Sequence, residues 1–184
     1  MKELYEKEIG RQYKYKGSII NLRVDRVILE NNKEARREIV EHNGAVAILP
    51  VDRGGNCYLV QQFRKPIEKT LIEVPAGKLD GEENPADCAR RELREETGLI
   101  AKELIELGHI YTSAGFSNEK IYLYLALNLQ MKQAQPDDDE FLNVLTYKWD
   151  CLFNLASENK IEDAKTNVII LRAMSKVKNY LTDK

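Results

Sequence analysis

Cysteine and histidine are scarce in this sequence. Its three cysteines are an odd number, scattered along the chain without any C-x-x-C spacing. A small secreted domain held by disulfides would carry paired cysteines, so we expect a reducing cytoplasm as the location. The two histidines, His42 and His109, are far apart, and we expect a structural or solvent role for each rather than metal ligation.

Long apolar runs and blocks of basic charge are missing as well. No run reaches the length of a membrane span, and the N-terminus MKELYEKEIG has no apolar core of the kind that a signal peptide needs. A net charge of -2 with no basic block argues against duplex DNA or RNA as a partner. The 184 residues, 43% hydrophobic and 32% charged, suit one globular domain with a sizeable core.

One short stretch, residues 77–99, is rich in acids. Pro85 suits the first turn of a helix and Gly98 suits the position just after its end. The stretch therefore predicts a loop followed by a helix from about Pro85 to Thr97.

Three glutamates of this helix, Glu92, Glu95 and Glu96, are spaced at i, i+3 and i+4, so their carboxylates share one face. Like charges in this arrangement repel, and a bound cation would offset the repulsion. Oxygen-only ligands favour Mg²⁺ or Mn²⁺ over zinc, and Glu83 in the preceding loop would add a fourth carboxylate. The alternative is that these charges form only a solvated helix face.

The spacing of the whole stretch resembles the Nudix box. Gly77 is followed by five residues, Glu83 and seven more residues, and then by the sequence RELREETGL at 91–99. The resemblance implies a hydrolase that cleaves nucleoside diphosphates linked to another group, with a divalent metal held by the box glutamates. It also implies the Nudix fold, an α/β/α sandwich with a mixed sheet.

Alternating and apolar segments predict the other elements. We expect strands at 19–29, 36–40, 45–50, 58–63, 71–74, 103–111, 120–127 and 142–149, and helices at 151–157 and 163–181. The strands at 45–50 and 58–63 are predicted to form a hairpin around a glycine turn. A stripe on the last helix is predicted to face the core, and it consists of Ile170, Leu171, Met174, Val177 and Leu181.

The expected fold class is α/β, with the Nudix domain at residues 43–184 and an antiparallel β-hairpin unit at residues 1–42. A two-stranded unit is marginal alone, so it must pack on the body or on another subunit. Several motifs, at 37–39, 62–64, 73–77 and 111–119, resemble the ADP-ribose pyrophosphatase branch of the family. That branch forms dimers that exchange the N-terminal region, which implies a homodimer here.

The resemblance also implies site residues. The metal ligands would be Glu92, Glu95, Glu96 and the carbonyl of Ala76, with Glu92 and Glu96 the surest. Arg91 is expected to orient a carboxylate, such as Glu83, by a bidentate salt bridge. The substrate-binding residues would be Arg37 on the adenine side, Arg64 on a phosphate or ribose oxygen, Glu73, and Glu119 on the terminal ribose.

The attacking water needs a base, which the ADP-ribose branch supplies from an acidic loop after the box. Glu140 is our choice in the loop PDDDEF at 136–141, and Asp139 is the alternative. The competing reading is that these acids only solvate the loop. Arg64 likewise has an alternative, a surface salt bridge with Glu68.

The implied reaction is Mg²⁺-dependent hydrolysis of ADP-ribose to AMP and ribose 5-phosphate. Ala114 stands where the branch usually has proline, which leaves selectivity against other nucleoside diphosphate sugars open. The alternatives are a Nudix pyrophosphatase for a nucleotide sugar, NADH or a diadenosine polyphosphate, and a non-catalytic ADP-ribose sensor. A sensor usually loses box glutamates, and this chain keeps them.

Overall fold

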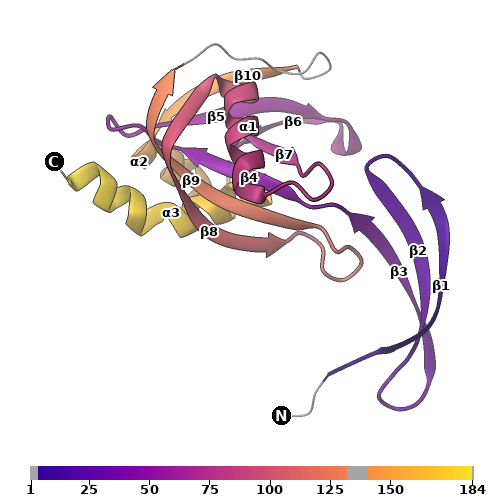
Figure 1. The fold of residues 1–184 in the computed structure, drawn as a ribbon. Coiled ribbons are helices and arrows are strands. Elements are labelled where there is room, and N and C mark those ends of the chain that lie inside the picture. The colour runs from indigo at the N-terminus through magenta and orange to yellow at the C-terminus, as the bar shows by residue number, and fades with distance from the viewer. Residues whose placement is uncertain (1–3, 132–140, 184) are drawn as a thin grey trace. The chain divides into compact units, whose positions relative to one another are not determined.

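The computed structural model describes residues 4–131 and 141–183, and the chain divides into two compact units (Figure 1). One unit comprises residues 1–44 and 111–120. The other comprises residues 45–110 and 121–184. Each unit is described by itself below.

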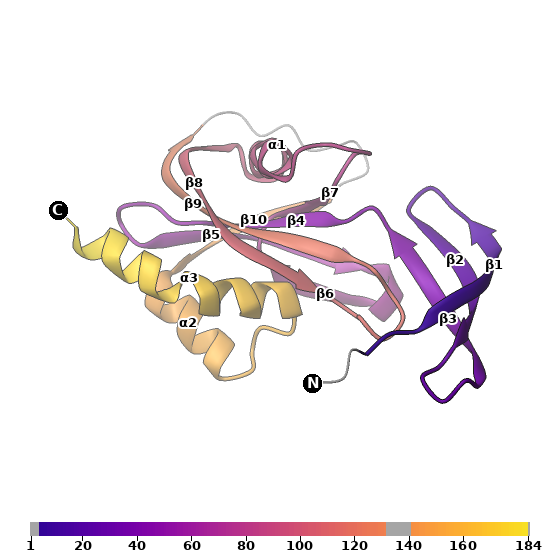
Figure 2. The ribbon, with the colours of Figure 1, turned by 60° about the horizontal axis from the view of Figure 1, so that its bottom comes forward.

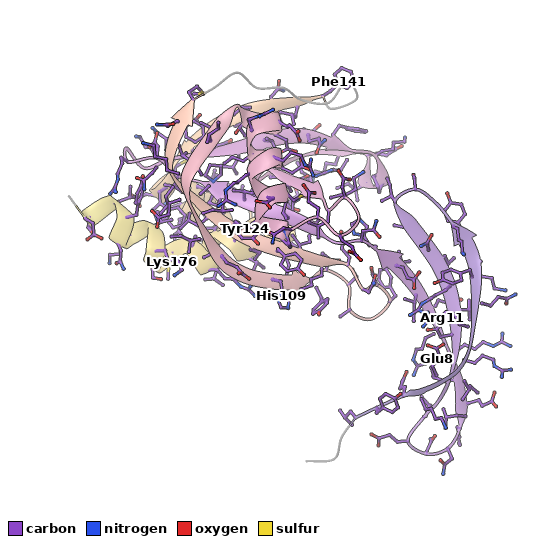
Figure 3. The ribbon with its side chains drawn as sticks, in the orientation of Figure 1. Glu8, Arg11, His109, Tyr124, Phe141 and Lys176 are labelled. Carbon is purple, nitrogen blue, oxygen red and sulfur yellow. The ribbon has the colours of Figure 1, made fainter. Side chains whose placement is uncertain are left out.

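The N-terminal unit contains a three-stranded antiparallel sheet in the order β1-β2-β3. Its strands are β1 (Lys7–Lys16), β2 (Ile20–Ile28) and β3 (Glu34–His42). The predicted β2–β3 pair is present, but β1 was not predicted. Its side chains are mostly exposed, as Glu8 and Arg11 illustrate (Figure 3), so the strand lacks the apolar alternation that sequence reasoning depends on.

The second unit holds the remaining elements. They are β4 (Ala45–Pro50), β5 (Asn56–Arg64), the 3₁₀ helix η1 (Lys65–Ile67), β6 (Lys69–Glu73), β7 (Ala76–Lys78), α1 (Pro85–Thr97), β8 (Leu99–Tyr111), β9 (Lys120–Met131), β10 (Leu142–Lys148), α2 (Trp149–Ser157) and α3 (Ala164–Thr182).

These elements form the expected sandwich (Figure 2), with α1 on one side of the strands and α2 and α3 on the other. One sheet has the order β7-β4-β9-β8 and the other β10-β5-β6. Strand β4 runs parallel to β9 and antiparallel to β7, so the first sheet is mixed. The predicted fold class is therefore confirmed.

The two sides of the sandwich have separate apolar cores. The larger core packs α2 and α3 on the strands through residues such as Leu49, Leu125 and Ile169. The smaller one packs α1 through Cys88, Ala89 and Leu93. Because α1 buries this narrow stripe of small and branched side chains, its neighbouring glutamates lie at the edge of the packed surface.

One prediction about strand pairing is wrong, and one about packing is wrong in part. Strands β4 and β5 flank the predicted turn, but they belong to different sheets, and an isolated antiparallel bridge joins Val51, after β4, to Cys57 of β5. On α3, Leu171 and Met174 are exposed. Ile170 and Val177 are buried as predicted, and Leu181 packs against the core. The other residues that α3 buries are Thr166, Ile169, Ala173 and Tyr180.

In the part of the chain that the structure describes, no helix is both long enough and apolar enough to cross a membrane.

Candidate active site

Helix α1 begins and ends at the residues that its sequence predicts. The Asn84 side chain accepts a hydrogen bond from the Ala86 N–H at 2.9 Å, which caps the N-terminus next to Pro85. Gly98 ends the helix in the left-handed conformation, with φ 71°, and donates to the Arg94 carbonyl. The position of the acidic face is therefore fixed by local sequence signals at both ends.

Two glutamates of α1 meet the backbone of β7. Glu96 Oε2 accepts a hydrogen bond from the Ala76 N–H at 3.1 Å. The Glu92 carboxylate lies where a side chain on Gly77 would be, since a Cβ there would be 1.9 Å from its carboxyl carbon. Both glutamates are buried, with 7% and 3% of Glu92 and Glu96 exposed. The absent side chain of Gly77 thus makes room for a carboxylate.

Arg91 connects the acids of the box. Its guanidinium donates to both carboxylate oxygens of Glu83, at 3.2 and 3.0 Å, in a bidentate contact. Its Nη1 also donates to Glu92 at 2.7 Å and to Glu95 at 3.0 Å. The hydrogen bond from Arg91 holds the pKa of Glu83 below its ordinary value. Arg91 therefore offsets the mutual repulsion of the acids in the protein itself.

The donors at this place suit a hard divalent cation. They are carboxylate oxygens from α1 next to the backbone of Ala76 and Gly77, with no thiol or imidazole among the predicted ligands. Among residues 4–131 and 141–183, no three His, Cys, Asp or Glu side chains are gathered closely enough to hold a metal ion. Arg91 lies between Glu92 and Glu95 and forms an ion pair with each of them.

In the second unit, Arg64 forms an ion pair with the buried carboxylate of Glu73. Arg64 Nε and Nη2 each donate to Glu73 at 2.7 Å, and the Glu73 side chain is 1% exposed. Lys165 of α3 also binds Glu73. The expected alternative partner of Arg64, Glu68, binds Lys65 instead.

Arg37 and Glu119 belong to the N-terminal unit. Arg37 binds the Glu6 carboxylate through Nε at 2.9 Å and through Nη2. Glu119 accepts a hydrogen bond from the Thr112 hydroxyl at 2.5 Å and lies 3.9 Å from His42 Nδ1. Both side chains are therefore held by neighbours within their own unit.

The predicted base, Glu140, and its alternative, Asp139, lie outside the described residues. The described chain resumes at Phe141, whose side chain is 84% exposed (Figure 3). Sequence reasoning missed Lys165 and Thr166, which contact Glu73 and Val74 from α3. The only local signal there was Asp163, a typical N-cap residue three positions before Thr166.

Comparison with known proteins agrees with this geometry. The family model described as NUDIX domain matches residues 41–169. The chain is 43% identical to an ADP-ribose pyrophosphatase of Bacillus subtilis over 90% of this chain and 91% of that protein. It is 39% identical to a methanol dehydrogenase activator of Bacillus methanolicus, covering 90% of each chain. A crystal structure of an ADP compounds hydrolase superposes with a TM-score of 0.84 at 16% identity, covering 97% of this chain and 98% of that one.

Proposed function

This chain belongs to the Nudix family, and from that premise we propose that it hydrolyses the pyrophosphate of ADP-ribose to AMP and ribose 5-phosphate. The observation that carries the proposal is the contact of two buried box glutamates, Glu92 and Glu96, with the backbone of Ala76 and Gly77. The similarity to an ADP-ribose pyrophosphatase over nine-tenths of both chains supports the choice of substrate.

Nudix hydrolases use divalent metals, and we propose Mg²⁺, with Mn²⁺ as a substitute, at this site. Glu92, Glu95, Glu96 and the Ala76 carbonyl would hold it. When bound, it would neutralise phosphate charge and make water more acidic. Arg91 keeps Glu83, Glu92 and Glu95 oriented through the hydrogen bonds described above.

The other proposed site residues follow from the resemblance of their motifs to the ADP-ribose pyrophosphatase branch. Arg64 binds a phosphate or ribose oxygen, because its fork-shaped guanidinium matches such oxygens and its side chain is 40% exposed beside the buried Glu73. Arg37 binds on the adenine side and Glu119 at the terminal ribose. Glu140 takes a proton from the attacking water or aligns that water.

The proposal includes a homodimer that exchanges residues 1–42, and a cytoplasmic location. The dimer is supported by the exposed apolar side chains of the N-terminal unit, which include Leu4, Tyr5, Tyr15 and Ile19. The location is supported by the scattered, odd set of cysteines.

A panel of nucleoside diphosphate derivatives tests the activity. ADP-ribose, GDP-mannose, NADH and a diadenosine polyphosphate are each incubated with Mg²⁺ or with EDTA, and the products are separated by chromatography. We expect AMP and ribose 5-phosphate from ADP-ribose with the highest kcat/KM, and no turnover in EDTA. Faster cleavage of another compound would assign that substrate instead.

The variant Glu96→Gln tests the metal-ligand set, because it removes the negative charge of one proposed ligand and keeps the shape of its side chain. We expect it to fold as the wild type does, because it relieves repulsion on α1, and to lose nearly all turnover. Circular dichroism and steady-state kinetics check both results. Tight ADP-ribose binding without turnover in the wild type would favour a sensor, and near wild-type activity of the variant at saturating Mg²⁺ would remove Glu96 from the ligand set.

A further inference from the structure

The first turn of α3 contacts the segment that leads into the active site. Lys165 Nζ binds a carboxylate oxygen of Glu73, and Thr166 Oγ1 accepts a hydrogen bond from the Val74 N–H at 2.9 Å. Thr166 is fully buried, and the Lys165 side chain is 11% exposed. Two adjacent residues of one helix thus bind the last residue of β6 and the residue that follows it.

Asp163 fixes both of these α3 side chains. Its Oδ2 accepts from the N–H and the hydroxyl of Thr166, at 2.9 and 2.6 Å, and its Oδ1 accepts from Lys165 at 3.1 Å. The Thr166 hydroxyl gives its only hydrogen to Asp163, so its lone pair is directed to Val74. The first turn of α3 therefore presents an oriented hydrogen-bond acceptor, the Thr166 hydroxyl, and an oriented cation, the Lys165 ammonium group.

The contacted residues lie close to the metal-ligand candidates in sequence. Val74 is two residues before Ala76, whose N–H binds Glu96, and three before Gly77, against which Glu92 lies. The intervening Pro75 has a fixed φ angle, and its carbonyl accepts from the Ile48 N–H at 2.8 Å. The segment is thus held by β4 on one side and by Thr166 on the other, and the fixed φ angle of Pro75 limits how far Val74 and Ala76 can move independently.

Lys165 also helps to neutralise the buried Glu73 carboxylate, to which Arg64 is bound. The Glu73 carboxylate, 1% exposed, is shared between Arg64 and Lys165. Without Lys165 the carboxylate would depend on Arg64 alone, and a buried charge that loses a partner is costly. The guanidinium would then be drawn further to Glu73 and away from an anionic ligand at its exposed side.

We propose that the first turn of α3 positions the active-site segment Glu73–Gly77, with Lys165 and Thr166 as the positioning residues. Thr166 holds the backbone that meets Glu92 and Glu96. Lys165 holds Glu73, the residue directly before Val74 in the same backbone segment, and through Glu73 it also holds Arg64. The kinetic part of this proposal rests on the proposed function, whereas the metal-binding part does not.

Mn²⁺ binding to the full-length protein without substrate is the direct test, measured from the free-ion signal in electron paramagnetic resonance. We expect Lys165→Met and Thr166→Val to raise the Mn²⁺ dissociation constant by about tenfold, since mutation of the residues that support metal ligands lowers metal affinity by about 10- to 100-fold. With ADP-ribose and saturating Mg²⁺, Lys165→Met should also raise KM more than it lowers kcat. Lys165→Arg and Thr166→Ser keep the charge and the hydroxyl, and should recover most of the affinity.

Two variants control for charge and for stability. Lys69→Met removes another lysine that links β6 to the segment before α3, but its ion pair with Glu162 is exposed, with 53% and 56% of the two side chains accessible to solvent. Val177→Ala removes buried volume from α3, about 16 Å further along the helix at 1.5 Å per residue. We expect both to bind Mn²⁺ as the wild type does, even though Val177→Ala melts at a lower temperature.

The proposal is overturned if Lys165→Met and Thr166→Val bind Mn²⁺ within twofold of the wild type. It is also overturned if Val177→Ala weakens binding as much as they do, or if the wild type binds no Mn²⁺ without substrate. If Thr166→Val does not fold, Lys165→Met decides the matter. A wild type that binds Mn²⁺ but does not cleave ADP-ribose would contradict the proposed function, and the binding comparison would still judge the positioning residues.

Discussion

At the scale of single residues, Gly77 matters because it has no side chain. A Cβ at this position would lie 1.9 Å from the carboxyl carbon of Glu92, so Gly77→Ala must displace that carboxylate. We expect the variant to fold and its affinity for Mg²⁺ or Mn²⁺ to fall about tenfold or more. Mutations that disturb the groups around a metal ligand lower metal affinity on this scale.

Calorimetric titration with Mn²⁺ measures this loss, and Gly10→Ala is the matched control. A Cβ at Gly10 meets only the Arg26 side chain, at an ordinary 3.6 Å. Equal metal affinity of Gly77→Ala and Gly10→Ala would show that metal binding does not depend on the position of the Glu92 carboxylate against β7.

Glu140 is the residue whose predicted role differs most from that of the box acids. A group that takes a proton from water acts mainly in the transition state, so Glu140→Gln should lower kcat and kcat/KM alike, by about 10²- to 10⁴-fold. Metal affinity should stay unchanged. Steady-state kinetics on the single variants checks this, with Asp137→Asn as the control. If Asp139→Asn alone is crippled, Asp139 is the base.

Sequence reasoning found residues that local spacing brings together and missed those that only the fold brings together. Glu83, Arg91 and Glu92 lie within one box, and their spacing predicted the acidic cluster. The contact of Lys165 with Glu73 spans 92 residues. Nothing in the neighbourhood of either residue indicates the other, so the ion pair required the structure.

At the scale of elements, local sequence signals likewise predicted some features, and others depend on the fold. Helix α1 was predicted at Pro85–Thr97 because a proline and a glycine mark its ends, and the structure confirms these bounds. Strand β1 was missed because a polar strand has no hydrophobic period. The turn between β4 and β5 was recognised, but turn residues do not reveal that the chain passes from one sheet to another there.

The ion pair that joins β6 to α3 predicts a dependence of stability on pH. Burial alone would raise the pKa of Glu73, but the hydrogen bonds from Arg64 and the charge of Lys165 hold it below its ordinary value of 4.5. The folded state thus binds this proton less readily than the unfolded chain. Its contribution to stability is complete above pH 4.5 and is lost as pH falls through the lowered pKa.

Urea unfolding of the wild type and Glu73→Gln between pH 7 and pH 3 measures this contribution. We expect the difference in unfolding free energy between them to be constant from pH 7 to about 5 and to shrink at lower pH. A difference that already shrinks between pH 7 and 5 would mean that Glu73 is not held ionised by Arg64 and Lys165.

At the scale of the whole molecule, the N-terminal unit has little core of its own. Among its described residues, Val27 is the one apolar side chain that is fully buried, at 6% exposure. A three-stranded sheet with so small a core is marginal in water, so we expect the intact protein to be a dimer that covers it. Light scattering after size exclusion should give twice the chain mass.

Deletion of residues 1–42 should then abolish the dimer and most of the activity on ADP-ribose. The same chromatography, with circular dichroism to check folding, measures the result. A deleted chain that stays folded, monomeric and active would refute the exchange, and so would a monomeric full-length protein.

The pairing of β4 has a consequence for how the protein is made. All six residues of β4 are buried or half-buried, and its parallel partner β9 pairs Ala45 with Ile121, 76 residues later in the chain. At ~5–20 residues per second, the ribosome delivers β9 about 4–15 s after β4. Strand β7, which carries Ala76 and Gly77, emerges earlier and pairs with β4 on its other edge. During translation, the backbone that contacts Glu92 and Glu96 can therefore pair with β4 before β9 is available, while the other edge of β4 is still unpaired.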